Sequence, residues 1–335
     1  MIQTLSLFGG IAADDKAWKK LGIPTKKIDY VEIQPNRVRA YNALNPFKYS
    51  PQDIRGWNLK PDILVHGSPC QSFSRVGQRE GGEKGSGTQS SLMHETLRII
   101  KEMGSWQPKI VVWENVKGVL DKGMIGAFNQ YLHEMNELGY TNSFDVLDAR
   151  DFGIPHARER VFCVSILGEK VFDFRKLKRK TMRHISELLE YKFDDEVPEQ
   201  YLITIPSMLN KIAEVNPVKP SDTYKRRLDE IVDFCYTITE RQDRCPNAGY
   251  IKCAQGYRYL TELEVCRLLG YDDIDYKKLL TEFPSKPGKR NSVIYALFGN
   301  SIVVDVLEAI FELIISGDYA KELFEETKGQ LKFVC

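Results

Sequence analysis

The stretch Asp62-Ile63-Leu64-Val65-His66-Gly67-Ser68-Pro69-Cys70-Gln71 contains a short apolar run followed at once by a glycine, a proline and a cysteine. The run Ile63–His66 is typical of a strand buried in a parallel sheet, and Gly67 and Pro69 end it. Cys70 is therefore expected on a loop at the carboxyl end of a strand, where α/β proteins build their active sites. A thiol held beside a proline is a candidate nucleophile, and a buried, inert cysteine is the alternative interpretation.

The composition is that of an ordinary globular protein. The chain has 335 residues, of which 42% are hydrophobic and 28% charged, enough for one large domain or two. No apolar run approaches the roughly 20 residues that a membrane helix needs, and the N-terminus is interpreted as a strand rather than a signal peptide. Seven scattered cysteines fit free thiols in a reducing cytoplasm, and the spacing of Cys245 and Cys253 does not indicate zinc, so no metal is expected.

Apolar runs alternate with helical periodicity over the first half of the chain. This alternation predicts βαβ units and a mostly parallel sheet. Strands are expected at residues 4–8, 29–33, 63–66, 110–113, 141–148 and 160–166, and helices at 12–21, 35–44, 92–103 and 125–138.

The character of the sequence changes after about residue 167. A basic run at 175–183 and an acidic run at 187–196 follow, and one amphipathic helix is predicted at 222–241 with Leu228, Ile231, Val232 and Cys235 inward. A strand or helix at 301–315 restores the α/β pattern. We therefore expect an α/β domain at 1–169 and 286–335, interrupted by a second domain at 170–285.

Two groups of residues indicate a nucleotide-like ligand. The small residues of Phe8-Gly9-Gly10-Ile11 open a helix after the first strand, and such a turn directs backbone N–H groups at a carboxylate or phosphate. Glu32 ends the second strand, where an acidic side chain can hold ribose hydroxyls, although a surface glutamate is the alternative. Asp53 and Ile54 are weaker candidates for flanking an adenine.

Two further groups lie at strand ends beside Cys70. Glu114 ends the strand at 110–113, and a partly protonated carboxyl there could donate a hydrogen bond to a ring nitrogen; a helix cap is the alternative. Arg158 and Arg160 alternate at the start of the next strand, where they could present planar donors or form only an exposed charge pair.

Six motifs follow one another along the chain: Phe8-Gly9-Gly10, Ser68-Pro69-Cys70-Gln71, Glu114-Asn115-Val116, His156-Ala157-Arg158-Glu159-Arg160, Arg258-Tyr259-Leu260-Thr261 with Glu264, Arg267, Leu268 and Gly270, and Gly299-Asn300-Ser301-Ile302-Val303-Val304. In this order they resemble the motifs of the cytosine-5 DNA methyltransferase family, of bacterial or phage type, over all but the middle segment. The sequence departs from the usual motifs at Ala12-Ala13, Ser68 and His156.

The resemblance implies a doubly wound sheet of the S-adenosylmethionine-dependent methyltransferase type and transfer of a methyl group from that co-substrate to carbon 5 of cytosine. Cys70 would attack carbon 6 and Glu114 would donate to nitrogen 3. Arg160 would hold the cytosine carbonyl oxygen, with Arg158 supporting it, and Asn115 the exocyclic edge or the loop backbone. The residues implied for the co-substrate are Phe8, Gly10, Ile11, Glu32, Asp53, Ile54, Leu92, Asn300 and Ile302.

The resemblance also implies a partner, double-stranded DNA, whose target base must flip out of the helix. Residues 76–91 would close over that base, and segment 170–285 would be the target recognition domain, with its basic run on phosphates. The resemblance implies a monomer in the cytoplasm of a bacterial cell, with no membrane contact, encoded by the bacterium or by a phage or prophage. A restriction–modification pair with a cognate endonuclease is compatible with this expectation.

Three alternatives remain open from the sequence. A transfer-RNA cytosine methyltransferase would use the same catalytic motifs. A non-catalytic DNA-binding relative would not need Cys70, Glu114 and Arg160 intact. A nucleotide-binding oxidoreductase would need a stricter glycine fingerprint and leaves Cys70 unexplained.

Overall fold

A single twisted sheet organises the first half of this computed structural model, which describes residues 2–54, 61–68, 92–212 and 228–319 and two short strands beyond them. Its strands follow the order β2-β1-β3-β4-β6-β5, parallel except for β6, which is antiparallel to β4 and β5. Their bounds are β1 (Ile2–Leu7), β2 (Thr25–Val31), β3 (Ile63–His66), β4 (Ile110–Val116), β5 (Tyr140–Asp148) and β6 (Glu159–Leu167).

Both faces of this sheet are buried, which explains the continuous apolar runs in its central strands. On β4, Ile110 and Val112 join one apolar cluster while Val111 and Trp113 join another on the opposite face. Alternation along a strand sends neighbouring side chains to opposite faces, so a strand covered on both sides needs apolar residues throughout. The doubly wound arrangement predicted from the sequence is confirmed.

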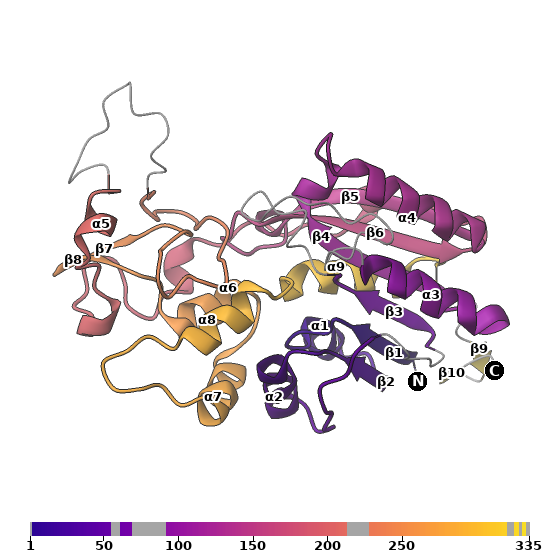
Figure 1. Cartoon of the computed structure of the whole chain (residues 1–335), viewed down its shortest axis with the longest axis horizontal. Helices are drawn as coiled ribbons and strands as arrows, with labels where there is room; N and C mark the ends of the chain where they lie inside the picture. The colour runs from indigo at the N-terminus through magenta and orange to yellow at the C-terminus, as the bar shows by residue number, and fades with distance from the viewer. Residues whose placement is uncertain are drawn as a thin grey trace.

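Helices cover both faces of the sheet (Figure 1). On one face lie α3 (Met93–Met103) and α4 (Ile125–Glu137); α1 (Ala13–Lys20) and α9 (Val304–Ser316) lie on the other. Trp18 of α1 stacks on Phe311 of α9, with ring centroids 3.9 Å apart. The C-terminal helix therefore completes the core begun by the first helix. Helix α2 (Pro35–Leu44) follows β2, as expected from Pro35 at its first position.

Segment 170–285 contains little regular structure among its described residues. A small apolar cluster that includes Ile203, Ile212 and Tyr259 organises part of it. Its elements are α5 (Pro206–Leu209), the antiparallel pair β7 (Ile251–Cys253) and β8 (Gly256–Arg258), α6 (Glu262–Leu268) and α7 (Asp273–Glu282), with single 3-10 turns at Phe174–Lys176, Ile185–Glu187 and Glu199–Tyr201.

The remaining elements are short or C-terminal. Helix α8 precedes the last core helix, and an antiparallel strand pair, β9 with β10, follows it. Their bounds are α8 (Ser292–Gly299), β9 (Glu325–Thr327) and β10 (Gln330–Lys332), with further 3-10 turns at Gly104–Trp106, Lys117–Leu120 and Ala149–Asp151.

The predicted amphipathic helix at 222–241 is wrong over residues 228–241, which form an extended, irregular segment. Cys235 is fully buried, whereas Val232, also predicted to face inward, is 52% exposed. The backbone instead bonds to its neighbours: Cys235 N–H donates to Pro155 O and Ala157 N–H to Cys235 O. The apolar spacing that resembled a helix face reflects contacts with two flanking segments.

The basic run at 175–183 pairs with acidic groups of the α/β domain. Lys178 lies 3.2 Å from Glu312 and Lys180 lies 2.9 Å from Glu308, both on α9, while Arg179 pairs with Asp151. Exposed pairs of this kind stabilise little individually. They do show that part of this run contacts the sheet domain, which leaves fewer free cations for phosphates.

Further along the segment, α7 packs on α2. Asp275 forms an ion pair of 2.7 Å with Lys16 of α1, and Asp272 pairs with the same lysine. Arg39 of α2 lies 2.8 Å from Glu282 at the end of α7. These contacts place α7 against the sheet domain, although α7 precedes the domain boundary predicted at residue 285. That boundary stays a prediction.

Contrary to the sequence-based expectation, one apolar stretch, Ser292–Ser316, is long enough to cross a membrane by length and composition, with a mean hydropathy of 1.7. It consists of α8 and α9, separated by a turn, and 72% of its apolar window is buried inside the protein. Its apolarity is that of two core helices.

Candidate active site

The turn after β1, at the carboxyl edge of the sheet, has an unusual backbone conformation. Phe8, Gly10 and Ala12 have φ angles of 55°, 53° and 69°, in the left-handed region that side chains disfavour. Between them, a Cβ on Gly9 would lie 2.5 Å from the Tyr30 ring, so only glycine fits there. The Tyr30 hydroxyl also donates a 2.5 Å hydrogen bond to Gly10 O. Tyr30 of β2 thus explains why Gly9, one of the small residues in this pattern, has no side chain.

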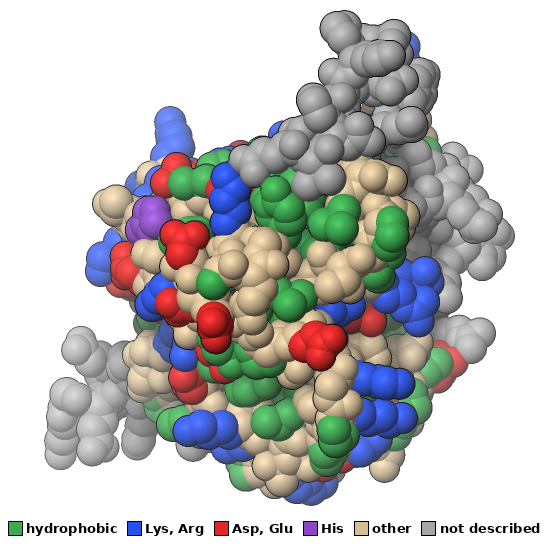
Figure 2. Space-filling view, turned by 90° about the vertical axis from the view of Figure 1, so that its left-hand side faces the viewer, with side chains coloured by type: hydrophobic (Ala, Val, Ile, Leu, Met, Phe, Trp, Pro, Cys, Tyr) green, Lys and Arg blue, Asp and Glu red, His purple; other side chains and the backbone are tan. Residues whose placement is uncertain are grey.

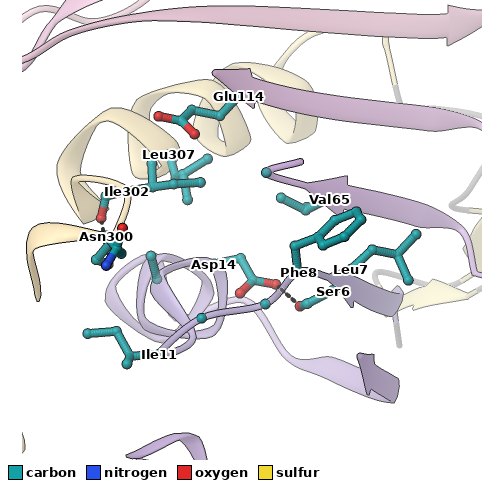
Figure 3. Close-up of a pocket in the computed structure, with 15 residues that line it drawn as sticks. Ser6, Leu7, Phe8, Ile11, Asp14, Val65, Glu114, Asn300, Ile302 and Leu307 are labelled. Carbon is teal, nitrogen blue, oxygen red and sulfur yellow. Dashed lines mark hydrogen bonds between the residues drawn. The ribbon is translucent and has the colours of Figure 1, made fainter. Parts of the chain in front are cut away.

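A cavity opens between this turn, the carboxyl ends of β3 and β4, and the loop between α8 and α9 (Figure 3). Five of the residues predicted for the co-substrate line it, and Glu114 reaches it from β4. The lining residues are Ser6, Leu7, Phe8, Gly9, Gly10, Ile11, Ala13, Asp14, Val65, Gly67, Glu114, Asn300, Ser301, Ile302 and Leu307.

Glu32 lies just beyond this cavity, on the other side of the turn. Its Oε2 accepts a 3.3 Å hydrogen bond from Gly10 N–H, and its Oε1 accepts one of 2.9 Å from Gln34 N–H. Arg37 approaches the same carboxylate at 3.4 Å. The group is thus fixed at the end of β2, and the alternative of a loose surface glutamate is wrong.

The other predicted adenine contacts do not line the cavity. Ile54 is buried in the core on the α3 side, and its carbonyl accepts a hydrogen bond from Arg98. Asp53 precedes it in the chain, and Leu92 is half-buried at the start of α3. The structure therefore brings together the turn and the α8–α9 loop, with these three residues outside the lining.

Glu114 and Arg160 form an ion pair at the carboxyl edge. Arg160 Nε lies 3.2 Å from Glu114 Oε1, and both side chains are largely buried. A Cβ on Gly67, the residue after β3, would lie 3.6 Å from Glu114 Oε2, so the carboxyl group reaches over that glycine. Burial raises the pKa of Glu114, while the positive charges of Arg160 and Arg158 oppose the rise. A carboxyl group in this setting can hold a proton that an exposed one would lose.

Asn115 holds the chain that leads to Cys70. Its Nδ2 donates to Ser68 O and Ser68 Oγ, each at 3.3 Å. The Ser68 hydroxyl also accepts a 3.0 Å hydrogen bond from Trp113 Nε1, and all three residues are buried. Of the two roles predicted for Asn115, the geometry favours the loop backbone. The hydroxyl of Ser68, the residue that departs from the usual motif, thus accepts hydrogen bonds from two side chains of β4, which the sequence did not indicate.

Arg158 differs in position from Arg160. Its guanidinium is buried and donates to three carbonyl groups: Ile238 O at 2.9 Å, Gly299 O at 3.1 Å and Ser301 O at 2.9 Å. It therefore connects β6 with the middle segment and with the cavity loop. The catalytic role expected for Arg158 stays a prediction. Its three backbone contacts favour a positioning role, and its positive charge also opposes the rise in the pKa of Glu114.

His156 takes part in the same connection. It is fully buried, its Nε2 accepts a hydrogen bond from Ile238 N–H at 3.1 Å, and its Nδ1 lies 3.2 Å from Leu268 O. One ring nitrogen is an acceptor and the other a donor, as in the neutral imidazole. An amide side chain could make the same two bonds, so this departure from the motif preserves the chemistry of the position.

Cys70, Gln71 and the predicted lid at 76–91 lie outside the described residues. Ser68, two positions before Cys70, is the last described residue before that gap. No group of three or more metal-ligating side chains occurs within the described ranges.

Comparisons with known proteins identify the family. The model of the C-5 cytosine-specific DNA methylase family matches residues 2–316. The type II methyltransferase M2.ScrFI of Lactococcus lactis subsp. cremoris is 33% identical over 270 residues, which cover 78% of this chain and 69% of that protein. The orphan methyltransferase M.SssI of Spiroplasma monobiae is 30% identical over 312 residues, 89% of this chain and 75% of its own.

Solved structures agree on the fold. The S. pombe Dnmt2 methyltransferase has a TM-score of 0.69 at 18% identity, with 94% of this chain and 99% of that chain covered. A prophage-encoded putative DNA modification methyltransferase of E. coli has a TM-score of 0.60 at 15% identity, with 94% of this chain and all of that chain covered. The chain belongs to the C-5 cytosine-specific DNA methylase family and is a DNA cytosine-5 methyltransferase.

His156 generates a prediction about stability. Burial, with the nearby charges of Arg158 and Arg160, holds its pKa well below the ordinary value. Below about pH 6.5 the unfolded chain therefore binds a proton at this histidine that the folded protein does not, and the free energy of unfolding falls as pH drops. We expect His156→Gln to remove about 1 kcal/mol of the loss between pH 6 and pH 5, measured by urea unfolding.

The matched control is His133→Gln, which removes an exposed ring on α4. An unchanged pH dependence in His156→Gln would show that the buried ring is already protonated in the folded protein, contrary to its two hydrogen bonds.

Proposed function

We propose that the protein transfers a methyl group from S-adenosylmethionine to carbon 5 of a flipped-out cytosine in a specific duplex DNA sequence, through a covalent bond to Cys70. The observation that carries the proposal is the buried Glu114–Arg160 pair. It stands over Gly67, three residues before Cys70, and reaches the cavity formed by the β1 turn.

The described residues suit the chemistry of cytosine. Carbon 5 becomes nucleophilic once the Cys70 thiolate adds to carbon 6, because the negative charge then spreads over the ring towards nitrogen 3 and the carbonyl oxygen. A protonated Glu114 would donate to nitrogen 3, and Arg160, held by Glu114, would donate to the carbonyl oxygen. Loss of the carbon 5 proton and departure of the thiolate restore the aromatic ring.

The chemistry of the cavity lining supports S-adenosylmethionine as the co-substrate, which would supply an electrophilic methyl group when bound. Phe8 presents an apolar ring, the tight turn exposes backbone at Gly10 and Ile11, and Asn300 and Ile302 approach from the opposite wall. Glu32 lies beyond Gly10, where its carboxylate could accept hydrogen bonds from the ribose hydroxyls. We assign the adenine to the side of Asp53, Ile54 and Leu92, which lie outside the lining.

DNA binding places the target base at Cys70 only after flipping, which costs a few kcal/mol. We infer that segment 170–285 reads the flanking bases as a target recognition domain. The face that it presents in Figure 2 carries acidic, basic and hydrophobic side chains interspersed, so phosphate contacts there would come from separated cations. We propose a cytoplasmic monomer that acts on DNA by itself; a cognate restriction endonuclease would be a separate partner.

Cys70→Ala should abolish methyl transfer and leave specific DNA binding largely intact, because the thiol forms its bond after docking. Binding is measured by titration with duplex DNA and transfer by incorporation of labelled methyl groups, with Cys245→Ala as the matched cysteine control. Wild-type protein should also form a covalent adduct with duplex DNA that carries 5-fluorocytosine at the target, since fluorine cannot leave as a proton does.

A Cys70→Ala protein with near-wild-type transfer would contradict the covalent route. If the protein instead formed an adduct with transfer RNA of the same base content and none with duplex DNA, the substrate would be transfer RNA and not DNA.

Glu114→Gln should lower the rate by about 10²- to 10⁴-fold, because the amide cannot hold the transferable proton. Since Glu114 lines the cavity, equilibrium binding of S-adenosylhomocysteine is the necessary second measurement and should change less than threefold. Collapse of that binding with an unaffected chemical step would make Glu114 a co-substrate ligand instead.

Exchange of segment 170–285 for that of a relative with another specificity should change which sequence is methylated, because a pocket for one flipped base cannot read its neighbours. Lys178, Lys180, Asp272 and Asp275 should be kept, since they pair with the sheet domain. Bisulfite sequencing of DNA from expressing cells reports the result. An active chimera with the original specificity would place reading outside this segment.

A further inference from the structure

A buried cluster of charged residues lies next to the turn after β1. Lys27 of β2 reaches two consecutive carboxylates in the first turn of α1: Asp14 at 2.7 Å and Asp15 at 2.9 Å. Ser6 of β1 donates a 2.5 Å hydrogen bond to Asp14, and Tyr41 donates one of 2.8 Å to Asp15. Burial lowers the pKa of the Lys27 ammonium, but attraction to the two aspartates outweighs it and the pKa stands above its ordinary value.

The two aspartates face different surroundings. Asp14 lines the cavity, as does Ser6, whereas Asp15 is outside the lining and bonds to Tyr41 of α2. Within the described residues, the side-chain hydrogen bonds that Asp14 accepts from Ser6 and Lys27 both end on Oδ2. Figure 3 shows the other oxygen pointing away from Ser6. A carboxylate that is 5% exposed thus keeps one oxygen for whatever fills the cavity.

We propose that Asp14 binds the α-ammonium group of the methionine part of S-adenosylmethionine, with Lys27 and Ser6 as positioning residues that fix its other oxygen. The inference rests on the proposed function. A buried carboxylate is matched best by a cationic N–H donor. The ammonium is the one such group on this molecule, because the sulfonium carries no proton.

The position of Asp14 agrees with that end of the ligand. Glu32, suited to the ribose hydroxyls, lies on the β2 side of Gly10, and Asp14 lies across the turn from it. Asn300 and Ser301 form the wall on the α9 side, where polar groups could face the carboxylate of the same amino acid. Asp14, the β1 turn and the Asn300 amide would thus surround the amino-acid end of the ligand, which carries both an ammonium and a carboxylate group.

The test compares Asp14→Asn with the matched control Asp15→Asn, which alters the same buried cluster but does not line the cavity. Each purified full-length protein is titrated calorimetrically with S-adenosylhomocysteine, with S-adenosylmethionine, and with a deamino analogue of S-adenosylhomocysteine that lacks only the ammonium. In Asp14→Asn the Kd of both natural ligands should rise roughly 10- to 100-fold, and that of the deamino analogue less than threefold. Asp15→Asn should stay within threefold of wild type for all ligands.

Three outcomes would overturn the inference: equal losses for all three ligands, a loss for S-adenosylmethionine alone, or wild-type affinity in Asp14→Asn. If Asp14→Asn does not fold, Asp14→Glu keeps the charge but moves it by one methylene, and it should weaken S-adenosylhomocysteine at least fivefold more than the deamino analogue. A wild-type protein that binds neither natural ligand would instead refute the proposed function.

Discussion

The arrangement of the site depends on one buried guanidinium. Arg158 donates to three carbonyl groups from two distant parts of the chain, one 80 residues further along and two at the end of α8 and in the α8–α9 loop, 141 and 143 residues further along. A buried cation is costly unless it is fully paired, so these carbonyls must stay where the guanidinium can reach them. Because Arg158 is two residues from Arg160, the same contact that joins the middle segment to the sheet also sets the start of β6 beside Glu114. The contacts that hold the middle segment and the α8–α9 loop and the ion pair at the carboxyl edge of the sheet thus come from residues two positions apart.

The sheet domain could be predicted because its physical signals are local. Residues 35–44 and 63–66 were predicted with the bounds that the structure gives, since a proline starts one element and a doubly buried apolar run defines the other. Segment 228–241 could not be predicted in this way. Its buried residues touch flanking segments far away in sequence, and apolar spacing alone does not distinguish such contacts from a helix face.

The same distinction holds within the site. Glu114, Asn115 and Arg160 lie at the ends of recognisable strands, so motif and position indicated them together. The contacts of the Ser68 hydroxyl with Trp113 and of the Asp14 carboxylate with Lys27 form only after folding, so the sequence did not indicate what either group does. The sequence placed Arg158 beside a strand as a planar donor but did not indicate its acceptors, because the carbonyl groups of Ile238, Gly299 and Ser301 lie far along the chain. The spacing of residues along the chain does not predict contacts between segments that are distant in sequence.

The stack of Trp18 on Phe311 has a consequence for how the protein is made. One face of the sheet is covered only when α9 joins α1, nearly 300 residues later in the chain. At about 5–20 residues per second, a ribosome needs on the order of 15 to 60 s to supply that helix after α1 emerges. During this interval the nascent sheet exposes an apolar face, and contacts of such long sequence separation form slowly. Until α9 is synthesised, the growing chain therefore carries exposed apolar surface of the kind that promotes aggregation.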